Sequence, residues 1–114
     1  PYTTLFRSGP PPTLHLAHGQ SLSLGNLSIE VRHVPGHSPG HLLFYIPALG
    51  AALCGDVIFY ESIGRTDLPG GNQAQLLQSI HQQVLTLPNQ TRLLPGHGPE
   101  TTVEHEAQSN PYLV

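Results

Sequence analysis

Glycine and proline divide this chain into short segments, and their spacing limits its fold more than any other feature. Each occurs 12 times in 114 residues, so together they make up about a fifth of the chain, against a typical ~12%. Apolar stretches are interrupted by one or the other within about ten residues, whereas a membrane-spanning helix needs ~20 apolar residues. We therefore expect a soluble protein of short elements joined by turns.

The charge balance excludes two classes of partner. The net charge is −3, and all four basic residues are arginines. Without a basic cluster, neither nucleic acid nor an anionic membrane surface is an expected partner. The small net charge and 38% hydrophobic content favour a folded domain over disorder. Cys54 is the single cysteine, and the chain opens with no charged-then-apolar leader, so we expect a cytoplasmic location.

The start of the chain is unusual. The sequence contains no methionine, so we expect a fragment or a processed product. Residues 1–8 resemble the conceptual translation of a widely used sequencing adapter, and a Gly/Pro linker follows them. We interpret residues 1–12 as an artefactual leader and linker and place the domain at residues 13–114.

The order of elements favours an α/β fold. Alternating apolar residues predict short strands within residues 14–31, and continuous apolar runs predict buried strands. Asn72 and one of Thr101 or Thr102 have the character of helix N-caps. The full expected order is strands within 14–31, at 42–46 and at 51–54, a long irregular loop at 55–71, a helix from the Asn72 cap to Pro88, a strand at 92–94 and a helix at 101–109.

Three Gly-containing turns carry the residues that could perform chemistry. His37 lies in Gly-His-Ser-Pro-Gly-His, Asp56 in Cys-Gly-Asp and His97 in Pro-Gly-His-Gly-Pro. Each turn follows an apolar strand, so glycine and proline would fix the direction of the side chain with little remaining freedom. Imidazole and carboxylate are common ligands of zinc and iron. A single histidine in such a loop is more often a surface residue, and Asp56 could instead cap its own turn.

The same motifs resemble a known family. Residues from His33 to Leu113 are similar to the C-terminal half of the metallo-β-lactamase superfamily, and within it to the glyoxalase II-type (hydroxyacylglutathione hydrolase-like) branch. The resemblance rests on five ordered elements at 36–41, 54–56, 64–71, 94–102 and 110–113. It implies an αββα sandwich, of which this chain would hold the C-terminal half as one sheet with covering helices.

The resemblance also implies a metal centre and a reaction. His37 and His97 would each bind one of two divalent ions, zinc or alternatively iron or manganese, and Asp56 would bridge them as the catalytic carboxylate. The implied reaction is hydrolysis of a small thioester such as a glutathione conjugate. Two alternatives stay open: a persulfide dioxygenase-like enzyme with a single iron, and a non-catalytic fragment or regulatory module.

The family's upstream His-x-His-x-Asp-His run is absent from this chain. His15 and His18 lack the following Asp-His pair, and we interpret them as structural. The resemblance therefore implies that four further ligands come from an N-terminal half, which the complete site requires. By itself, the chain is expected to bind metal weakly and to be inactive.

The remaining polar candidates have mostly structural interpretations. His33 and His41 flank the first turn and are expected to pack or form hydrogen bonds. His81 and His105 are expected at the surface, and Cys54 is expected to be a buried, inert thiol. Arg65 could bind a substrate carboxylate. Its alternative role is a pair with Asp67 that holds the loop.

Overall fold

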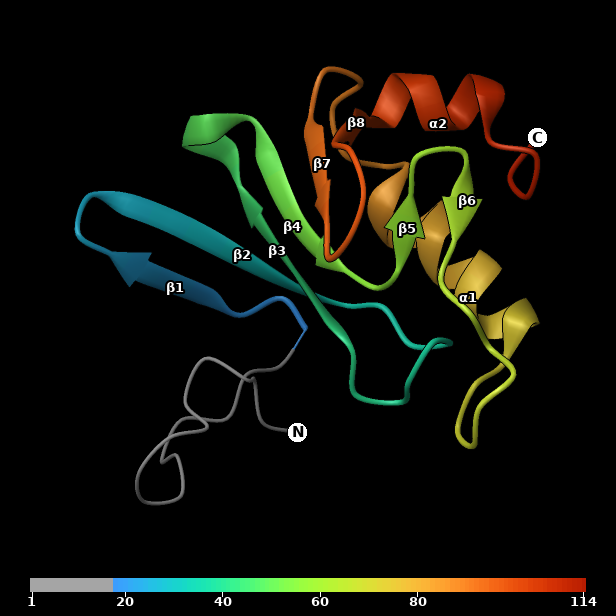
Figure 1. Ribbon diagram of the computed structural model, residues 1–114. Helices are drawn as coiled ribbons and strands as arrows, with labels where there is room; N and C mark the ends of the chain where they lie inside the picture. The colour runs from blue at the N-terminus through green and yellow to red at the C-terminus, as the bar shows by residue number, and fades with distance from the viewer. Residues whose placement is uncertain (1–17) are drawn as a thin grey trace.

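The computed structural model describes residues 18–114, which form a mixed α/β domain (Figure 1). Six strands make one sheet in the order β1-β2-β3-β4-β7-β8, and β5 and β6 make a separate hairpin. The strands are β1 (Ser21–Leu24), β2 (Leu27–His33), β3 (Leu42–Ile46), β4 (Ala51–Gly55), β5 (Ile58–Phe59), β6 (Ser62–Ile63), β7 (Arg92–Pro95) and β8 (Thr101–Thr102). The helical elements are η2 (Pro47–Leu49), α1 (Gln73–Ser79), η3 (Ile80–Val84) and α2 (Val103–Ser109).

The direction of the strands places three turns at one edge of the sheet. Strand β3 is antiparallel to both β2 and β4, so β2 and β4 run the same way. Strand β7 is parallel to β4, and the connection between them carries the β5–β6 hairpin, α1 and η3. The carboxyl ends of β2, β4 and β7 therefore meet at the same edge.

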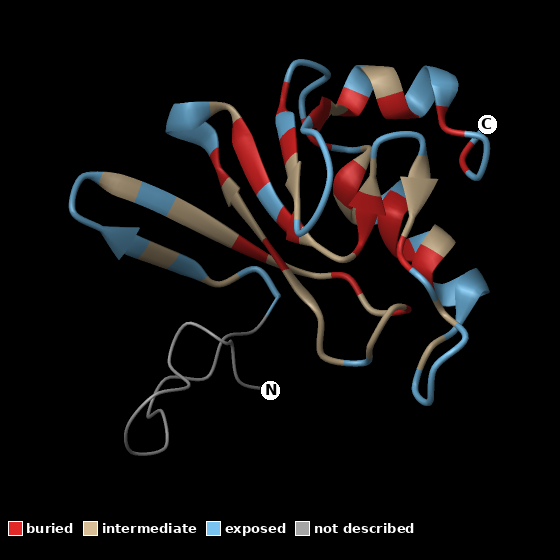
Figure 2. Ribbon diagram, viewed as in Figure 1, coloured by how far each residue is buried: buried red, intermediate tan, exposed pale blue. Residues whose placement is uncertain are grey.

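The two faces of the sheet differ in burial, because neighbouring residues of a strand point to opposite faces. One face packs against the helical layer, and the core is continuous between them (Figure 2). Its buried members include Leu43, Ala52, Cys54 and Leu93 from the sheet and Leu76, Ile80 and Val84 from the helices. On the opposite face, Leu53 is 45% exposed and stands in register with Phe44 and Leu94.

The two predicted N-caps are present. The Asn72 side chain accepts a hydrogen bond from the Gln75 amide at 2.9 Å, and that of Thr102 accepts one from the His105 amide at 3.1 Å. Such caps satisfy amides that have no partner within the helix. The first helix is nevertheless divided, because the Leu85 amide bonds to the Ile80 carbonyl five residues earlier and makes η3 a π-helix.

Several other sequence expectations need correction or lie outside the described residues. Residues 58–63 form a hairpin within the expected irregular loop, and Thr101 belongs to β8 instead of α2. Strand β4, expected to be buried, is buried at Ala51, Ala52 and Cys54 but exposed at Leu53. The expected strand residues 14–17 and the leader 1–12 are outside the described part. Among residues 18–114, no helix is long and apolar enough to cross a membrane.

The interpretation of Cys54 as a buried thiol is confirmed. It is fully buried, and this burial raises the pKa of the thiol from its ordinary value of 9.0 to about 12. We expect iodoacetamide to leave Cys54 unmodified in the native chain at pH 8 and to label it in urea. Because the unfolded chain loses the proton first, folding stability should fall as pH rises from 9.0 towards 12. Labelling of the native chain at the unfolded rate would contradict this burial.

Candidate metal centre

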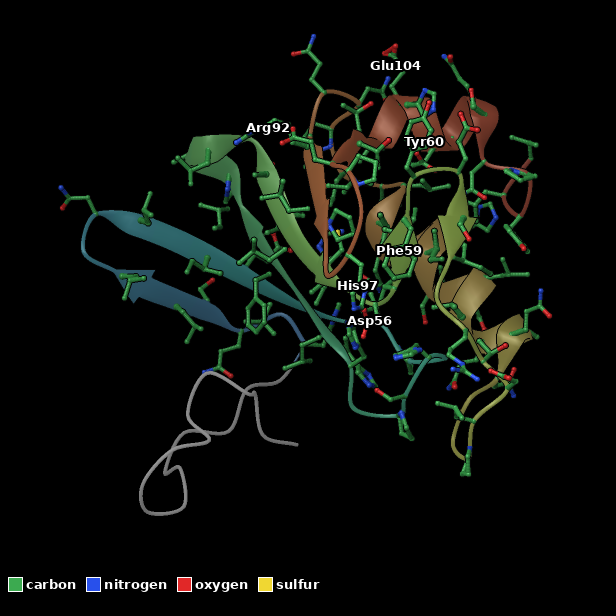
Figure 3. The ribbon with its side chains drawn as sticks, in the orientation of Figure 1. Asp56, Phe59, Tyr60, Arg92, His97 and Glu104 are labelled. Carbon is green, nitrogen blue, oxygen red and sulfur yellow. The ribbon has the colours of Figure 1, made fainter. Side chains whose placement is uncertain are left out.

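His37, Asp56 and His97 meet where the carboxyl ends of three strands converge. His37 follows β2, Asp56 comes directly after β4, and His97 follows β7. Figure 3 shows His97 and Asp56 next to each other at the lower end of β4 and β7. The structure thus brings together the three residues that the turn motifs indicated.

The Asp56 carboxylate lies between the two imidazoles. Its Oδ2 atom is 3.8 Å from Nε2 of His37, and its Oδ1 atom is 3.2 Å from Nδ1 of His97. Each carboxylate oxygen therefore faces a different histidine. This arrangement suits a carboxylate that shares its two oxygens between two cations, which lie ~3.5–4 Å apart in two-metal sites.

The hydrogen bond of His37 makes its other ring nitrogen available as a ligand. Nδ1 lies 2.8 Å from the Arg65 carbonyl oxygen. A carbonyl only accepts, so Nδ1 carries the proton, and in a neutral imidazole Nε2 then holds a lone pair. That lone pair faces Oδ2 of Asp56, which is also an acceptor. Two acceptors directed at one space favour a cation between them, and the 3.8 Å separation accommodates two ligand bonds of ~2.0–2.2 Å.

Two glycines leave the space that Asp56 occupies. A Cβ atom at Gly96 would lie 2.8 Å from Oδ1 of Asp56, and one at Gly64 would lie 1.9 Å from the Asp56 carbonyl oxygen. The Gly96 amide also donates to the Gly55 carbonyl at 2.8 Å. Glycine at these positions lets β7 and the loop after β6 approach the Asp56 turn closely.

His41 supports this turn, as expected for a histidine next to the ligand loop. Its Nε2 donates to the Cys54 carbonyl at 2.9 Å, and its ring stands edge-on to His37 with centroids 5.9 Å apart. A Cβ atom at Gly55 would lie 2.9 Å from the same ring. His41 thereby holds the backbone that leads into Asp56.

Phe59 is a neighbour of the site that the sequence did not indicate. Its ring centroid lies 6.0 Å from that of His97, with the rings inclined by 37°. The side chain of His97 is 78% exposed, so Phe59 is a notable constraint on its orientation. The sequence gives little indication of this role for Phe59, because the residue lies in a short hairpin within a segment expected to be an irregular loop.

Arg65 adopts the paired arrangement. Its Nε and Nη2 atoms donate to the two carboxylate oxygens of Asp67 at 2.8 and 3.0 Å. These hydrogen bonds lower the pKa of Asp67 and raise that of Arg65. Both side chains are mostly exposed, and the backbone carbonyl of Arg65 orients His37. The structure therefore links this loop to the candidate centre through the main chain.

The other described histidines agree with their expected structural or surface positions. His33 bonds through Nε2 to the Pro39 carbonyl at 2.6 Å, and its amide donates to Nδ1 of His18 at 3.2 Å. His81 is exposed, as expected. His105 lies at the surface, as expected, with its side chain 35% exposed, and its Nε2 lies 2.9 Å from the Glu61 carboxylate. His15 lies outside the described residues.

The donor set is chemically suitable but incomplete. Within residues 18–114, no group of three or more His, Cys, Asp or Glu side chains is arranged to hold one metal ion. The His37–Asp56 and Asp56–His97 pairs are each part of a coordination sphere. Their donors fit divalent zinc, iron or manganese, with further ligands required for each ion.

Comparison with known proteins shows the family of this chain. The family model described as "Metallo-beta-lactamase superfamily" matches residues 8–97. The chain belongs to the metallo-beta-lactamase superfamily. The mixed sheet with covering helices agrees with the fold of this family. Solved structures of similar proteins have the same fold. One of them, a crystal structure of TTHA1623 in a di-iron-bound form, has a TM-score of 0.80 and 44% identity, covering 91% of this chain and 50% of that one.

Two curated relatives show how much of a longer protein is matched. The probable metallo-hydrolase YqgX of Bacillus subtilis is 48% identical over 103 residues, which are 90% of this chain and 49% of the relative. The hydroxyacylglutathione hydrolase GloC of Haemophilus influenzae is 41% identical over 95 residues, or 83% and 45% respectively. The chain spans about half the length of these superfamily relatives.

Proposed function

We propose that this chain supplies the C-terminal half of a cytoplasmic, metal-dependent hydrolase that cleaves a small thioester. One observation carries the proposal: the two oxygens of Asp56 face two different histidines. In this proposal His37 and His97 each hold one divalent ion, zinc or alternatively iron or manganese, and Asp56 is shared between them. The catalytic residue of the described chain is then Asp56.

The roles of the residues follow from their contacts. Bound ions of this type supply Lewis acidity and activate water as a nucleophile near neutral pH. His37 presents Nε2 because its Nδ1 is fixed on the Arg65 carbonyl. Asp56 keeps both oxygens at the centre because Gly64 and Gly96 leave space for its backbone and its carboxylate. The chain's own residues thus set the positions of three ligands before any substrate binds.

Exposed apolar side chains on the sheet face opposite the helical core support the proposal of a second half. Leu53 on β4 and Leu24 on β1 are 45% and 68% exposed, and both lie on the face opposite the helical core. Apolar side chains on a sheet face ordinarily pack against another layer. A second sheet at this face would complete the sandwich and could bring the missing ligands to the same edge.

The proposed substrate class follows from the superfamily relatives. GloC is named as a hydroxyacylglutathione hydrolase, and we extend this to a glutathione-type thioester for the present protein. The test is to assay the intact protein for thiol release from a hydroxyacyl-glutathione thioester and to count its metals. We expect turnover with two divalent ions per protein. One iron with oxygen consumption would favour the persulfide dioxygenase-like alternative, and neither metal nor turnover would favour a non-catalytic module.

The isolated 114-residue chain offers a second check on the division of the site. It holds three of the proposed donor residues, so we expect weak metal binding and no hydrolysis. Zinc titration by calorimetry measures this directly. Tight binding of two ions by the isolated chain would contradict the proposal that an N-terminal half is required.

Arg65 remains the proposed contact for a substrate carboxylate. Its guanidinium uses two N–H groups for Asp67 and has further donors for a second carboxylate. In the intact protein, Arg65→Ala should raise KM about tenfold, the size expected for loss of one charge-assisted hydrogen bond. Arg92→Ala is the matched control, since Arg92 is also exposed and pairs with Glu100 at the other end of β7. An unchanged KM in Arg65→Ala would contradict the contact with the substrate and leave the ion pair with Asp67 as the role of Arg65.

A further inference from the structure

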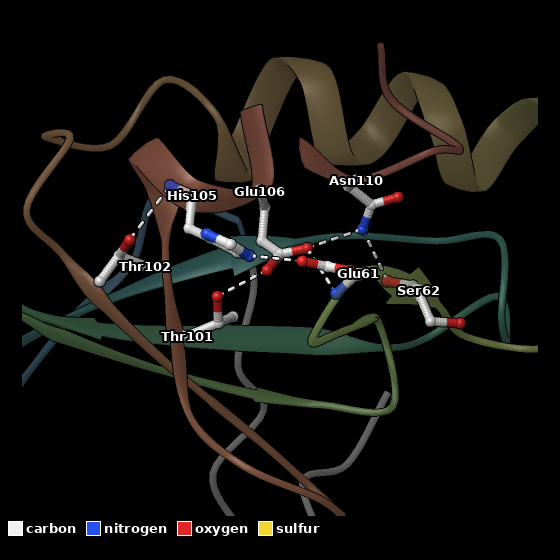
Figure 4. Close-up of polar contacts among 7 residues, drawn as sticks. All are labelled: Glu61, Ser62, Thr101, Thr102, His105, Glu106 and Asn110. Atoms are coloured by element: carbon white, nitrogen blue, oxygen red, sulfur yellow. Dashed lines mark hydrogen bonds and ion pairs between the residues drawn. The ribbon is translucent and has the colours of Figure 1, made fainter. Parts of the chain in front are cut away.

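A buried carboxylate on α2 gathers hydrogen bonds from three parts of the chain. Glu106 is fully buried. It accepts from the Thr101 hydroxyl at 2.5 Å, the Glu61 amide at 2.9 Å and the Asn110 side-chain amide at 2.8 Å (Figure 4). Burial of a carboxylate is costly unless donors satisfy it. Here one donor comes from β8, one from the end of α2 and one from the turn of the β5–β6 hairpin.

The hairpin turn depends on these contacts for its conformation. Among residues 18–114, Glu61 is the one non-glycine residue with a positive φ, at 56°. This region is unfavourable for a side chain with a Cβ atom. The Glu61 amide is held by Glu106, its carboxylate lies 2.9 Å from Nε2 of His105, and the neighbouring Tyr60 stacks on the His105 ring with centroids 4.9 Å apart.

The second side of the turn is attached to the same helix. The Asn110 side-chain amide donates to the Ser62 carbonyl at 3.0 Å as well as to Glu106. Asn110 is the C-cap of α2 and is fully buried. The turn and the first residue of β6 are therefore fixed to α2 and its C-cap.

The same hairpin carries Phe59 to His97. Phe59 pairs with Ser62 across the hairpin, and its ring lies 6.0 Å from the imidazole of His97. His97 itself stands on a Pro/Gly turn and is mostly exposed. A shift of the hairpin turn would move Phe59 and remove a constraint on the orientation of this imidazole.

We propose that Glu106 is a positioning residue that orients His97 through the β5–β6 hairpin and Phe59. The consequence for metal binding rests on the proposed ligand role of His97. The orientation of the His97 ring by Phe59 does not depend on that ligand role, because it is a contact between two side chains of this chain. Glu106 thereby acts on the centre without touching metal or substrate.

The test begins with two substitutions in the intact protein. Glu106→Ala removes all three acceptor contacts, and we expect the nuclear Overhauser effect between the Phe59 and His97 rings to be lost. Zinc affinity, measured by chelator competition, should fall about 10–100-fold, the usual range for changes in the groups that support metal ligands. Phe59→Leu interrupts the last contact without disturbing the buried network and should lower zinc affinity in the same direction, even if Glu106→Ala fails to fold.

Two further variants separate positioning from general stability. Glu106→Gln keeps an oxygen for Glu61 and Asn110, and its amide can donate to the Thr101 hydroxyl, so it should retain the ring contact and the zinc affinity. Glu104→Ala makes the same kind of change at an exposed position on α2 and should leave both unchanged. Phe59→Leu with the zinc affinity of the wild type, or folded Glu106→Ala with an intact ring contact, would overturn the proposal.

The two proposals fail in different ways. The ring contact is measured without metal or substrate, so it reports on positioning alone. If the contact depends on Glu106 but the protein hydrolyses no thioester, the proposed function fails and the positioning role stands. If thioester hydrolysis occurs and Glu106→Ala keeps the ring contact, the positioning role fails and the proposed function stands.

Discussion

Asp56→Asn should reduce kcat of the intact protein about 10³-fold. An amide offers one oxygen and one NH2 group, so it can no longer present an oxygen to both His37 and His97. Loss of shared cation binding removes several kcal/mol of transition-state stabilisation, and each ~1.4 kcal/mol corresponds to a factor of ten in rate. Steady-state thioester hydrolysis and metal analysis on the same sample measure the effect.

The control for this experiment is Glu104→Gln. It makes the same carboxylate-to-amide change on the exposed surface of α2 and should leave kcat and metal content at the wild-type level. Asp56→Asn with full metal content and more than a tenth of the wild-type kcat would remove Asp56 from the centre, because that loss is less than ~1.4 kcal/mol.

Gly36→Ala should cause a large loss of folding stability. A Cβ atom at this position would lie 2.3 Å from the Cα atom of Leu76, and the residue has a φ of +133°. The clash is with the backbone of α1, so a rotamer change cannot relieve it. Overpacking of ~1–3 kcal/mol and an unfavourable backbone conformation of ~1–2 kcal/mol together predict a loss of about 4 kcal/mol. Urea unfolding followed by circular dichroism measures this quantity.

Gly50→Ala separates the two causes of that loss. Gly50 also has a positive φ, +58°, but nothing lies within 4 Å of an added Cβ atom. It should lose only about 1 kcal/mol, the backbone contribution. Equal losses of folding stability in both variants would show that the close approach of the Gly36 turn to α1 does not cause the loss in Gly36→Ala.

The features that could be predicted from the sequence are those set by local signals. Asn72 and Thr102 cap their helices because a side-chain oxygen before a helix finds an amide two or three residues on. His37, Asp56 and His97 come together because each lies in a glycine turn after an apolar strand, and three such strands end at one edge. Short-range chemistry and strand direction were sufficient for both predictions.

The features that could not be predicted depend on distant contacts. The π-helical turn that begins at Ile80 could not be predicted, because apolar residues four positions apart fit an α-helix equally well. The pairing of His105 could not be predicted, because its partner Glu61 lies 44 residues away in sequence. The hairpin that carries Phe59 has two residues in each strand, too few to show an alternating pattern.

The most direct test of the central claim is a crystal structure of the intact protein with anomalous data at the absorption edges of the bound metals. We expect two ions, one bound by Oδ2 of Asp56 and His37 and the other by Oδ1 of Asp56 and His97. A single ion, or ions that make no contact with the Asp56 carboxylate, would contradict it.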